Sequence, residues 1–415
     1  MQILVVTTDV RVEERGAHVI LGDRLETVSA TYGVLLGGES RPATFVIDRT
    51  GIIRFQYRAG QKPGRVFVND EKLFPDAHWS YDRPSMSQLF KVLDGLPDTP
   101  GMDQARKEKI ARLAKATILV LTAALHDGDS YVRAEAAMRL AEKRAGAKDA
   151  VPDLIKLLGD KVGYVRSEAA LALGKIGADA KAAVPRLIEL MKDADEGVRL
   201  AAGIAIRDLG PEARAAVPTL LEAQNDWHSE VRGISHEALG KIGPAAVPEL
   251  TEALRSKNAH IRSTVASVLG TFGPAAKPAM PALLAAVKDK YWGTRKQAIL
   301  ALGKIDPEAG GLARLLIEAL ADEVNAVRNA AAVTLGSLPT HKDIAIPALT
   351  AALQDKDGWV RLGVAQSLWQ LQPGDRRVVP VLIDLLKESD TDVRNGAAET
   401  LKSIDPKAAK EAGLR

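Results

Sequence analysis

Arginine recurs at a nearly constant spacing through the last three-quarters of this 415-residue chain. The steps between successive copies are 33 residues, except for one step of 30 between Arg232 and Arg262. The recurring positions are Arg133, Arg166, Arg199, Arg232, Arg262, Arg295, Arg328, Arg361 and Arg394. Repetition at a period in this range is typical of a solenoid, in which each repeat buries its apolar face only against its neighbours.

Other residue types hold fixed places relative to these arginines. Aspartate stands six residues before most of them, with Ser256 and Glu388 as the exceptions, and leucine or isoleucine stands seven residues after each. Proline precedes the aspartate by eight residues in most repeats. The 30-residue step arises because the segment 243–248 replaces the longer segment 210–218.

Each of these positions has a physical reason that favours a pair of helices per repeat. Proline is tolerated in the first turn of a helix. An aspartate between two helices can accept hydrogen bonds from the N-terminal amides of the second helix. Val165, Ala169, Leu173 and Ile176 form a helical apolar stripe. We expect Gly174 or Gly177 to end or loosen that helix.

The pattern Pro-x7-Asp-x5-Arg resembles HEAT repeats, in the short bacterial form found in phycobiliprotein lyases. The resemblance predicts a mainly α fold, an α-solenoid of nine helical hairpins over about residues 112–405, with terminal caps at 103–116 and 405–415. It implies a ladder of hydrogen bonds between neighbouring repeats. The expected members are Asp160, Arg166, Asp193, Arg199, Asp226, Arg232, Asp289, Arg295, Asp322, Arg328, Asp355 and Arg361. The alternative, a basic stripe for phosphate, is disfavoured because nearly every arginine has an acidic residue at fixed spacing.

Residues 1–101 have a different pattern, and we expect a domain boundary at Gly101 between this segment and the repeat array at 102–415. Residues 2–7 predict a strand, residues 43–57 a β-hairpin with a turn at Gly51, and residues 85–96 an amphipathic helix. The stretch 41–54 resembles the hairpin of the peroxiredoxin/redoxin branch of the thioredoxin fold. The resemblance implies a partial thioredoxin-like α/β segment.

The segment departs from that family because the strand–helix unit carrying the peroxidatic cysteine is missing. Arg41 matches the arginine that stabilises the thiolate, but here it has no thiolate partner. An incomplete sheet exposes an unpaired edge. Docking on the helical array, strands from a second chain, or a longer gene that begins upstream are the three ways to complete it.

Composition narrows the function classes. The chain contains no cysteine, so its own residues offer no disulfide or thiolate site. A net charge of +3 spread evenly gives no strong nucleic-acid signal. The histidines have no metal-ligand spacing, and no phosphate-binding motif is present, so we expect no metal and no cofactor. Without a signal peptide or membrane segment we expect a cytoplasmic protein, unless the gene begins upstream.

Functional residues are expected in the positions that differ between repeats. Large aromatics stand in the turns before the second helices, where they could anchor a partner or fill gaps between repeats: Tyr131, Tyr164, Trp227, Tyr291, Trp292 and Trp359. Apolar residues one and five positions after the arginine could line a protein groove or pack between adjacent helices. They are Leu200, Ile204, Leu300, Val333 and Leu362, with Lys296 and Gln366 among them.

The sequence thus favours a non-enzymatic scaffold that binds a protein or peptide partner on the concave face of the solenoid. A redoxin-type peroxidase or thiol oxidoreductase, with its cysteine half outside this chain, is the enzymatic alternative. A phycobilin lyase-like chaperone, detectable by tetrapyrrole absorbance, is a third. Duplex DNA binding, as in some HEAT-like glycosylases, requires a strongly salt-dependent affinity.

Overall fold

The computed structural model describes residues 32–36, 39–47, 53–58 and 104–414. In the first part, β1 (Tyr32–Leu36), β2 (Glu39–Ile47) and β3 (Ile53–Arg58) form an antiparallel sheet in the order β1-β2-β3. The pairing of β2 with β3 confirms the predicted hairpin, whereas β1 was not anticipated. Arg41 lies in β2, opposite Val34 of β1.

The remaining predictions for the N-terminal segment lie outside the described residues. These are the strand at 2–7, the helix at 85–96 and the boundary at Gly101. The thioredoxin-like and redoxin assignments therefore stay predictions.

The described helices fall into two compact units that divide inside α8, after Ala205. The first unit contains a capping helix and three helical pairs. They are α2 (Gln104–Leu113), α3 (Ile118–Ala124) with α4 (Ser130–Lys143), α5 (Val151–Leu157) with α6 (Gly163–Ile176), and α7 (Val184–Leu190) with the start of α8 (Glu196–Leu209).

The second unit contains six pairs and a terminal cap. They are α9 (Val217–Glu222) with α10 (Ser229–Ile242), α11 (Val247–Ala253) with α12 (Ala259–Thr271), α13 (Met280–Ala286) with α14 (Trp292–Ile305), α15 (Leu312–Ala319) with α16 (Asn325–Gly336), α17 (Lys342–Ala352) with α18 (Gly358–Leu371), α19 (Val378–Leu385) with α20 (Thr391–Ile404), and α21 (Pro406–Glu411).

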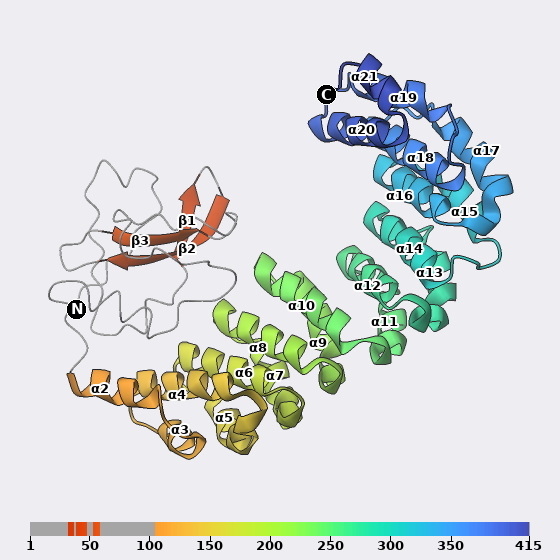
Figure 1. Ribbon diagram of the computed structural model, residues 1–415. Coiled ribbons are helices and arrows are strands. Elements are labelled where there is room, and N and C mark those ends of the chain that lie inside the picture. Colours follow the sequence, from red (N-terminus) through yellow and green to blue (C-terminus); the bar gives the residue numbers. More distant parts are fainter. Residues whose placement is uncertain (1–31, 37–38, 48–52, 59–103, 415) are drawn as a thin grey trace. The chain divides into compact units, whose positions relative to one another are not determined.

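The nine helical pairs within residues 118–404 confirm the predicted solenoid. Inside the second unit, the long helices α10 to α20 stack side by side as one layer and the short helices α9 to α19 form the other (Figure 1). This unit curves with the layer of long helices on its inner side (Figure 1).

The connections between repeats explain the irregular spacing. Most are single 3₁₀ segments that lead directly into the proline-containing first turn of the next short helix, such as η2 (Arg144–Ala150) and η3 (Gly177–Ala183). Before α11 the 3₁₀ segment shrinks to η6 (Pro244–Ala246). The shorter segment accounts for the 30-residue step between Arg232 and Arg262.

The core lies between the two layers. The leucine or isoleucine seven residues after each arginine is fully buried in all nine repeats. The valine before the arginine is buried in most repeats, and Thr294, which replaces it in the sixth, is buried with its hydroxyl 3.4 Å from the carbonyl oxygen of Ala259. Each fully buried leucine contributes roughly 1.5–3 kcal/mol, so the apolar positions supply most of the folding free energy.

The two glycines that we expected to end or loosen the second helix of the second repeat have different roles. Gly177 has a φ of +82° and ends α6, a conformation that favours glycine. Gly174 lies inside α6, and a Cβ atom there would come within 2.7 Å of the Cα atom of Ala205 on α8. Gly174 therefore does not end the helix. Its missing side chain allows α8 to pack closely against α6.

The glycine equivalent to Gly174 is closely packed in one repeat of the second unit and has free space around it in another. At Gly270 in α12 a Cβ atom would lie 2.9 Å from the Cα atom of Ala301, whereas at the equivalent Gly240 in α10 nothing lies within 4 Å. We expect Gly270→Ala to lower the free energy of unfolding by about 1–3 kcal/mol through overpacking. The matched Gly240→Ala should raise it by about 0.5–1 kcal/mol because alanine favours the helix. Urea denaturation of both variants measures this, and equal effects would contradict the packing explanation.

Candidate functional site

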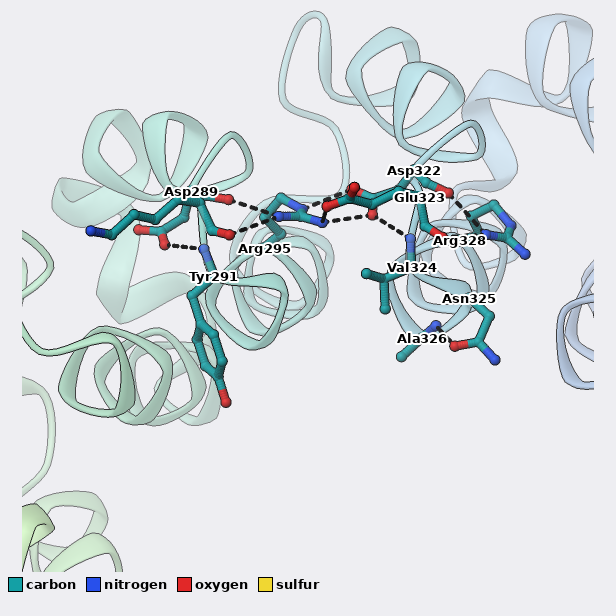
Figure 2. Close-up of polar contacts among 10 residues, drawn as sticks. Asp289, Tyr291, Arg295, Asp322, Glu323, Val324, Asn325, Ala326 and Arg328 are labelled. Atoms are coloured by element: carbon teal, nitrogen blue, oxygen red, sulfur yellow. Dashed lines mark hydrogen bonds and ion pairs between the residues drawn. The ribbon is translucent and has the colours of Figure 1, made fainter.

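An arginine–aspartate ladder runs through the turns between short and long helices. Figure 2 shows Arg295, whose Nε and Nη2 atoms donate to the two carboxylate oxygens of Asp322 in the next repeat, both at 2.8 Å. Its Nη1 atom donates to the carbonyl oxygen of Asp289 in its own repeat at 3.0 Å. Asp322 also accepts the amide of Val324 at 2.9 Å. Each rung thus joins two repeats and caps the turn before a long helix.

Equivalent rungs confirm most of the predicted ladder. They join Arg133 to Asp160, Arg166 to Asp193, Arg262 to Asp289 and Arg328 to Asp355, and Glu388 takes the aspartate's place beside Arg361. Arg199 donates to the carbonyl oxygen of Asp193 at 2.9 Å. Its rung to Asp226 would join the two units and stays a prediction.

The rung at Arg232 differs from the others. The residue in the aspartate position of the next repeat is Ser256, and Arg232 pairs with no carboxylate among the described residues. Its Nη1 atom still donates to the carbonyl oxygens of Asp226 and Trp227, at 2.7 and 3.1 Å. The ladder predicted from sequence therefore has one incomplete rung.

Burial and hydrogen bonding act in opposite directions on the ladder carboxylates. For Asp322, burial raises the pKa, but the hydrogen bonds from Arg295 and from the Val324 amide outweigh it and leave the pKa below its ordinary value. The pKa values of Asp289 and Asp355 are lowered by the same balance. The carboxylates of Asp289, Asp322 and Asp355 are thus charged in the folded protein at neutral pH.

The turns before the long helices carry exposed tryptophans in the second unit. Trp227, Trp292 and Trp359 are 75%, 41% and 43% exposed and belong to alternate repeats, at the starts of α10, α14 and α18. The indole of Trp359 donates to Asp390 at 3.2 Å. The ring centroid of Trp227 lies 3.6 Å from that of His228.

The tyrosines predicted at this edge are less exposed. The guanidinium of Arg106 in α2 lies 5.1 Å from the ring centroid of Tyr131, so this side chain contacts the capping helix. Tyr164 is half-buried at the start of α6. Tyr291 is half-buried and its ring lies beside His260 and Trp292, with centroids 5.6 and 5.8 Å away. The gap-filling alternative thus describes the tyrosines better than the tryptophans.

The apolar residues predicted on the long helices differ in how much of each side chain is exposed. Val333 is exposed, and Leu200, Ile204 and Leu300 are half-buried. The prediction for Leu362 was wrong, because this side chain is only 4% exposed. Its Cδ2 atom lies 2.7 Å from where a Cβ atom of Gly396 would be, so the absent side chain on α20 leaves the space that Leu362 fills.

Sequence reasoning missed two exposed residues on α3, Leu119 and Val120. Alignment on the 33-residue period would have found them. Leu119 stands where the next repeat has the exposed Pro152, and Val120 stands where it has the partly exposed Asp153. Only Leu121, which aligns with the buried Leu154, belongs to the core in this part of α3.

Outside the ladder, burial sets the direction of the pKa shift of two side chains, Glu135 and His236. Burial raises the pKa of Glu135 in α4, against the opposing effect of its ion pair with Arg139. Burial also lowers the pKa of His236 in α10. In the described part of the chain no three histidine, aspartate or glutamate side chains converge as a metal site, and no helix is long and apolar enough to cross a membrane.

The ladder predicts unequal costs at two adjacent carboxylates that touch the same arginine. We expect Asp322→Ala to reduce the free energy of unfolding by about 3 kcal/mol, because Arg295 would remain buried without its partner. Glu323 lies 3.3 Å from Arg295 Nη2 but is 82% exposed, so Glu323→Ala should cost under about 0.5 kcal/mol. Urea denaturation compares them, and similar losses would show that the rung does not stabilise the array.

The lowered pKa values predict acid sensitivity. A carboxylate whose pKa is lower in the folded state stabilises the fold above its unfolded pKa, and this contribution is lost as pH falls through the folded value. We therefore expect a melting temperature that is nearly constant from about pH 7 to 5 and falls below about pH 4. Asp322→Asn should melt at a lower temperature at neutral pH and show a shallower acid decline. An unchanged acid decline in this variant would argue against the rung as its source.

Comparison with known proteins identifies the repeat. The family model of HEAT repeats matches residues 118–207, 217–302, 247–336, 280–369 and 346–412. No curated protein sequence matches this chain significantly.

Several solved structures share the fold. Kap121p bound to the SUMO protease Ulp1p has a TM-score of 0.53 and 13% identity, covering 80% of this chain and 41% of Kap121p. Kap121p alone gives 0.51 and 15%, with coverage of 80% and 41%. A structure of Kap95p with RanGDP gives 0.50 and 12%, with coverage of 81% and 54%. The chain thus spans about half the length of these proteins or less, and at such identity the likeness concerns the fold alone. With the repeats matched over most of its length, the chain belongs to the HEAT-repeat family.

Proposed function

We propose that this protein is a non-enzymatic scaffold that binds a protein partner along the tryptophan edge, defined as Trp227, Trp292 and Trp359. The observation that carries the proposal is the exposure of three indoles at the same turn of alternate repeats. Because the long helices stack side by side in the second unit, these turns follow one edge of a single layer (Figure 1).

An exposed tryptophan leaves a large apolar surface in water. Binding a partner would bury this surface, and that burial is favourable in free energy. Tryptophan is also among the residues that contribute most to protein–protein interfaces, because a rigid ring buries a large area. Three such residues on one edge are suited to a folded or extended partner that contacts several repeats.

The inner layer can extend this contact. Val333 on α16 is exposed, and Leu300 at the equivalent position of the neighbouring helix α14 is half-buried, so two adjacent long helices both carry an accessible apolar side chain. The long helices also carry polar side chains that are not buried, such as Lys296 on α14 and Gln366 on α18. A protein surface of mixed character fits this layer better than a purely apolar ligand.

The fold neighbours agree with a binding role. The titles of their structures describe Kap121p bound to Ulp1p and to Nup53p, and Kap95p acting on RanGDP. These partners are properties of those proteins, and a shared solenoid supports only the general mode of binding. In the described part of the chain, nothing favours the redoxin or the tetrapyrrole-chaperone alternative.

The tryptophan edge can be tested with the full chain. Partners retained by the parent protein from its own cells would be purified, and their dissociation constants measured by biolayer interferometry. We expect each change of Trp227, Trp292 or Trp359 to alanine to weaken binding about 10-fold, or about 1.4 kcal/mol.

The control is Ile344→Ala on the short helix α17. Ile344 is 40% exposed, close to the 41% of Trp292, and it lies outside the tryptophan edge. This variant should bind within about twofold of the parent. If every retained partner bound the triple tryptophan variant as tightly as the parent, the proposed function would fail.

A further inference from the structure

The incomplete rung of the ladder leaves one arginine with its main hydrogen-bonding edge unused. In the arginine–aspartate rungs of the second unit, Nε and Nη2 both donate to the carboxylate of the next repeat, as Arg262 does to Asp289 at 2.6 Å for both bonds. Arg232 has the equivalent position in α10, but in the described part of the chain it makes only the Nη1 bonds to Asp226 and Trp227. Two of its donor atoms therefore have no protein acceptor there.

The turn opposite Arg232 keeps the form of the other turns. Ser256 accepts the amide of Asn258 at 3.2 Å, as the ladder aspartates accept the amide two residues on. Its carbonyl oxygen accepts Nη1 of Arg262 at 2.8 Å, as the aspartate carbonyls do for their arginines. Ser256 thus preserves the turn, and the only function it omits is that of the carboxylate.

The orientation of Arg232 is preset in the same way. Its Nη1 atom is held by the two carbonyl oxygens of its own turn, the arrangement also seen for Arg262 and Arg328. This arrangement leaves the Nε–Nη2 edge toward the following repeat. A guanidinium fixed in this way loses little conformational entropy when it binds a second planar group.

Charge and exposure also distinguish this rung. Arg262, Arg295 and Arg328 are buried, whereas Arg232 is partly exposed. The exposed Lys257 follows Ser256 directly, as Lys290 follows Asp289 and Lys356 follows Asp355. Because Ser256 brings no carboxylate, this rung carries one more net positive charge than those rungs. An anionic group is the chemistry that complements it.

We propose that the Nε–Nη2 edge of Arg232, which Ser256 leaves without a carboxylate, binds an aspartate or glutamate side chain of the protein partner, and that this side chain completes the ladder from outside. The site deepens the proposed function, on which it rests, by naming the chemistry of the partner. A carboxylate is favoured because the equivalent arginines Arg262, Arg295 and Arg328 each pair this same edge of the guanidinium with an aspartate in bidentate geometry.

Trp227 places the site on the tryptophan edge. Its carbonyl oxygen is one of the two acceptors that hold Arg232, and its indole is the most exposed of the three. An acidic residue of the partner in the rung would bring the neighbouring apolar residue of the same segment against the indole. The expected ligand is therefore an acidic residue flanked by an apolar one.

The decisive variant is Ser256→Asp, which supplies the carboxylate from within the chain. It should raise the melting temperature by completing the rung and should block an external carboxylate. Ser256→Ala is the matched control, because it changes the same position without adding a carboxylate and should keep the site. Arg232→Gln removes the guanidinium and with it the Nε and Nη2 donors. Circular dichroism on each full-length variant verifies the fold.

Ligands would be selected from a phage-displayed library of random peptides on the full-length parent protein, and the affinities of the enriched peptides measured by fluorescence anisotropy. We expect a shared aspartate or glutamate, and at least about 10-fold weaker binding when it is changed to its amide. Ser256→Asp and Arg232→Gln should show the same loss, whereas Ser256→Ala should bind like the parent.

The site would be overturned by enrichment of no peptide, by enriched peptides without a shared acidic residue, or by equal binding to the parent and to Ser256→Asp. Inorganic phosphate that bound the parent but not Ser256→Asp, with no acidic peptide enriched, would identify a small-anion site and also overturn the proposal. If Ser256→Asp kept a partner that the triple tryptophan variant lost, the rung would fail as a site and the scaffold function would stand.

Discussion

The bidentate hydrogen bond between an arginine of one repeat and a carboxylate of the next is the interaction on which the order of this array depends. In a solenoid each repeat contacts only its neighbours, so the relative placement of repeats must be specified at every junction. Apolar layers alone specify it weakly, because leucine and alanine surfaces can slide and repack. The ladder adds directional bonds: Arg295, for example, joins the carbonyl of Asp289 to the carboxylate of Asp322.

A buried ion pair contributes less net stability than its Coulomb attraction suggests, because both charges lose water. Here the same carboxylate also accepts a backbone amide, and the same guanidinium also donates to a backbone carbonyl. With both partners in place the desolvation is compensated, and with one absent it is not. The ladder therefore penalises any misplaced neighbour more than it rewards the correct one, and this property makes an incomplete rung chemically distinctive.

Close helix packing accounts for the composition of the chain. Aromatic residues make up only 4% of it, and the long helices present glycine and alanine where they meet. Gly270 lies against Ala301, and Gly336 lies against Ser367, at separations that leave no room for larger side chains. No aromatic side chain in residues 104–414 is fully buried, and most of them lie at the turns before the long helices. The tryptophans at those turns are available to a partner because the interior cannot accommodate them.

The 33-residue spacing of arginine, aspartate and proline determined the solenoid, the nine helical pairs and most rungs, because a strict repeat allows only one way of burying its apolar stripe.

Residue type alone could not separate functional from structural positions among the residues that differ between repeats. From the sequence, Leu362 and Val333 belong to the same apolar set, yet Gly396 on the next helix leaves a space that Leu362 fills. Tyr131 and Trp227 belong to the same aromatic set, yet the guanidinium of Arg106 on the capping helix contacts the ring of Tyr131. Ser256 was visible as an exception, but only the fixed orientation of Arg232 gives the substitution a chemical meaning. Exposure at each variable position depends on the side chain of a neighbouring repeat or cap, and only the tertiary structure brings the two together.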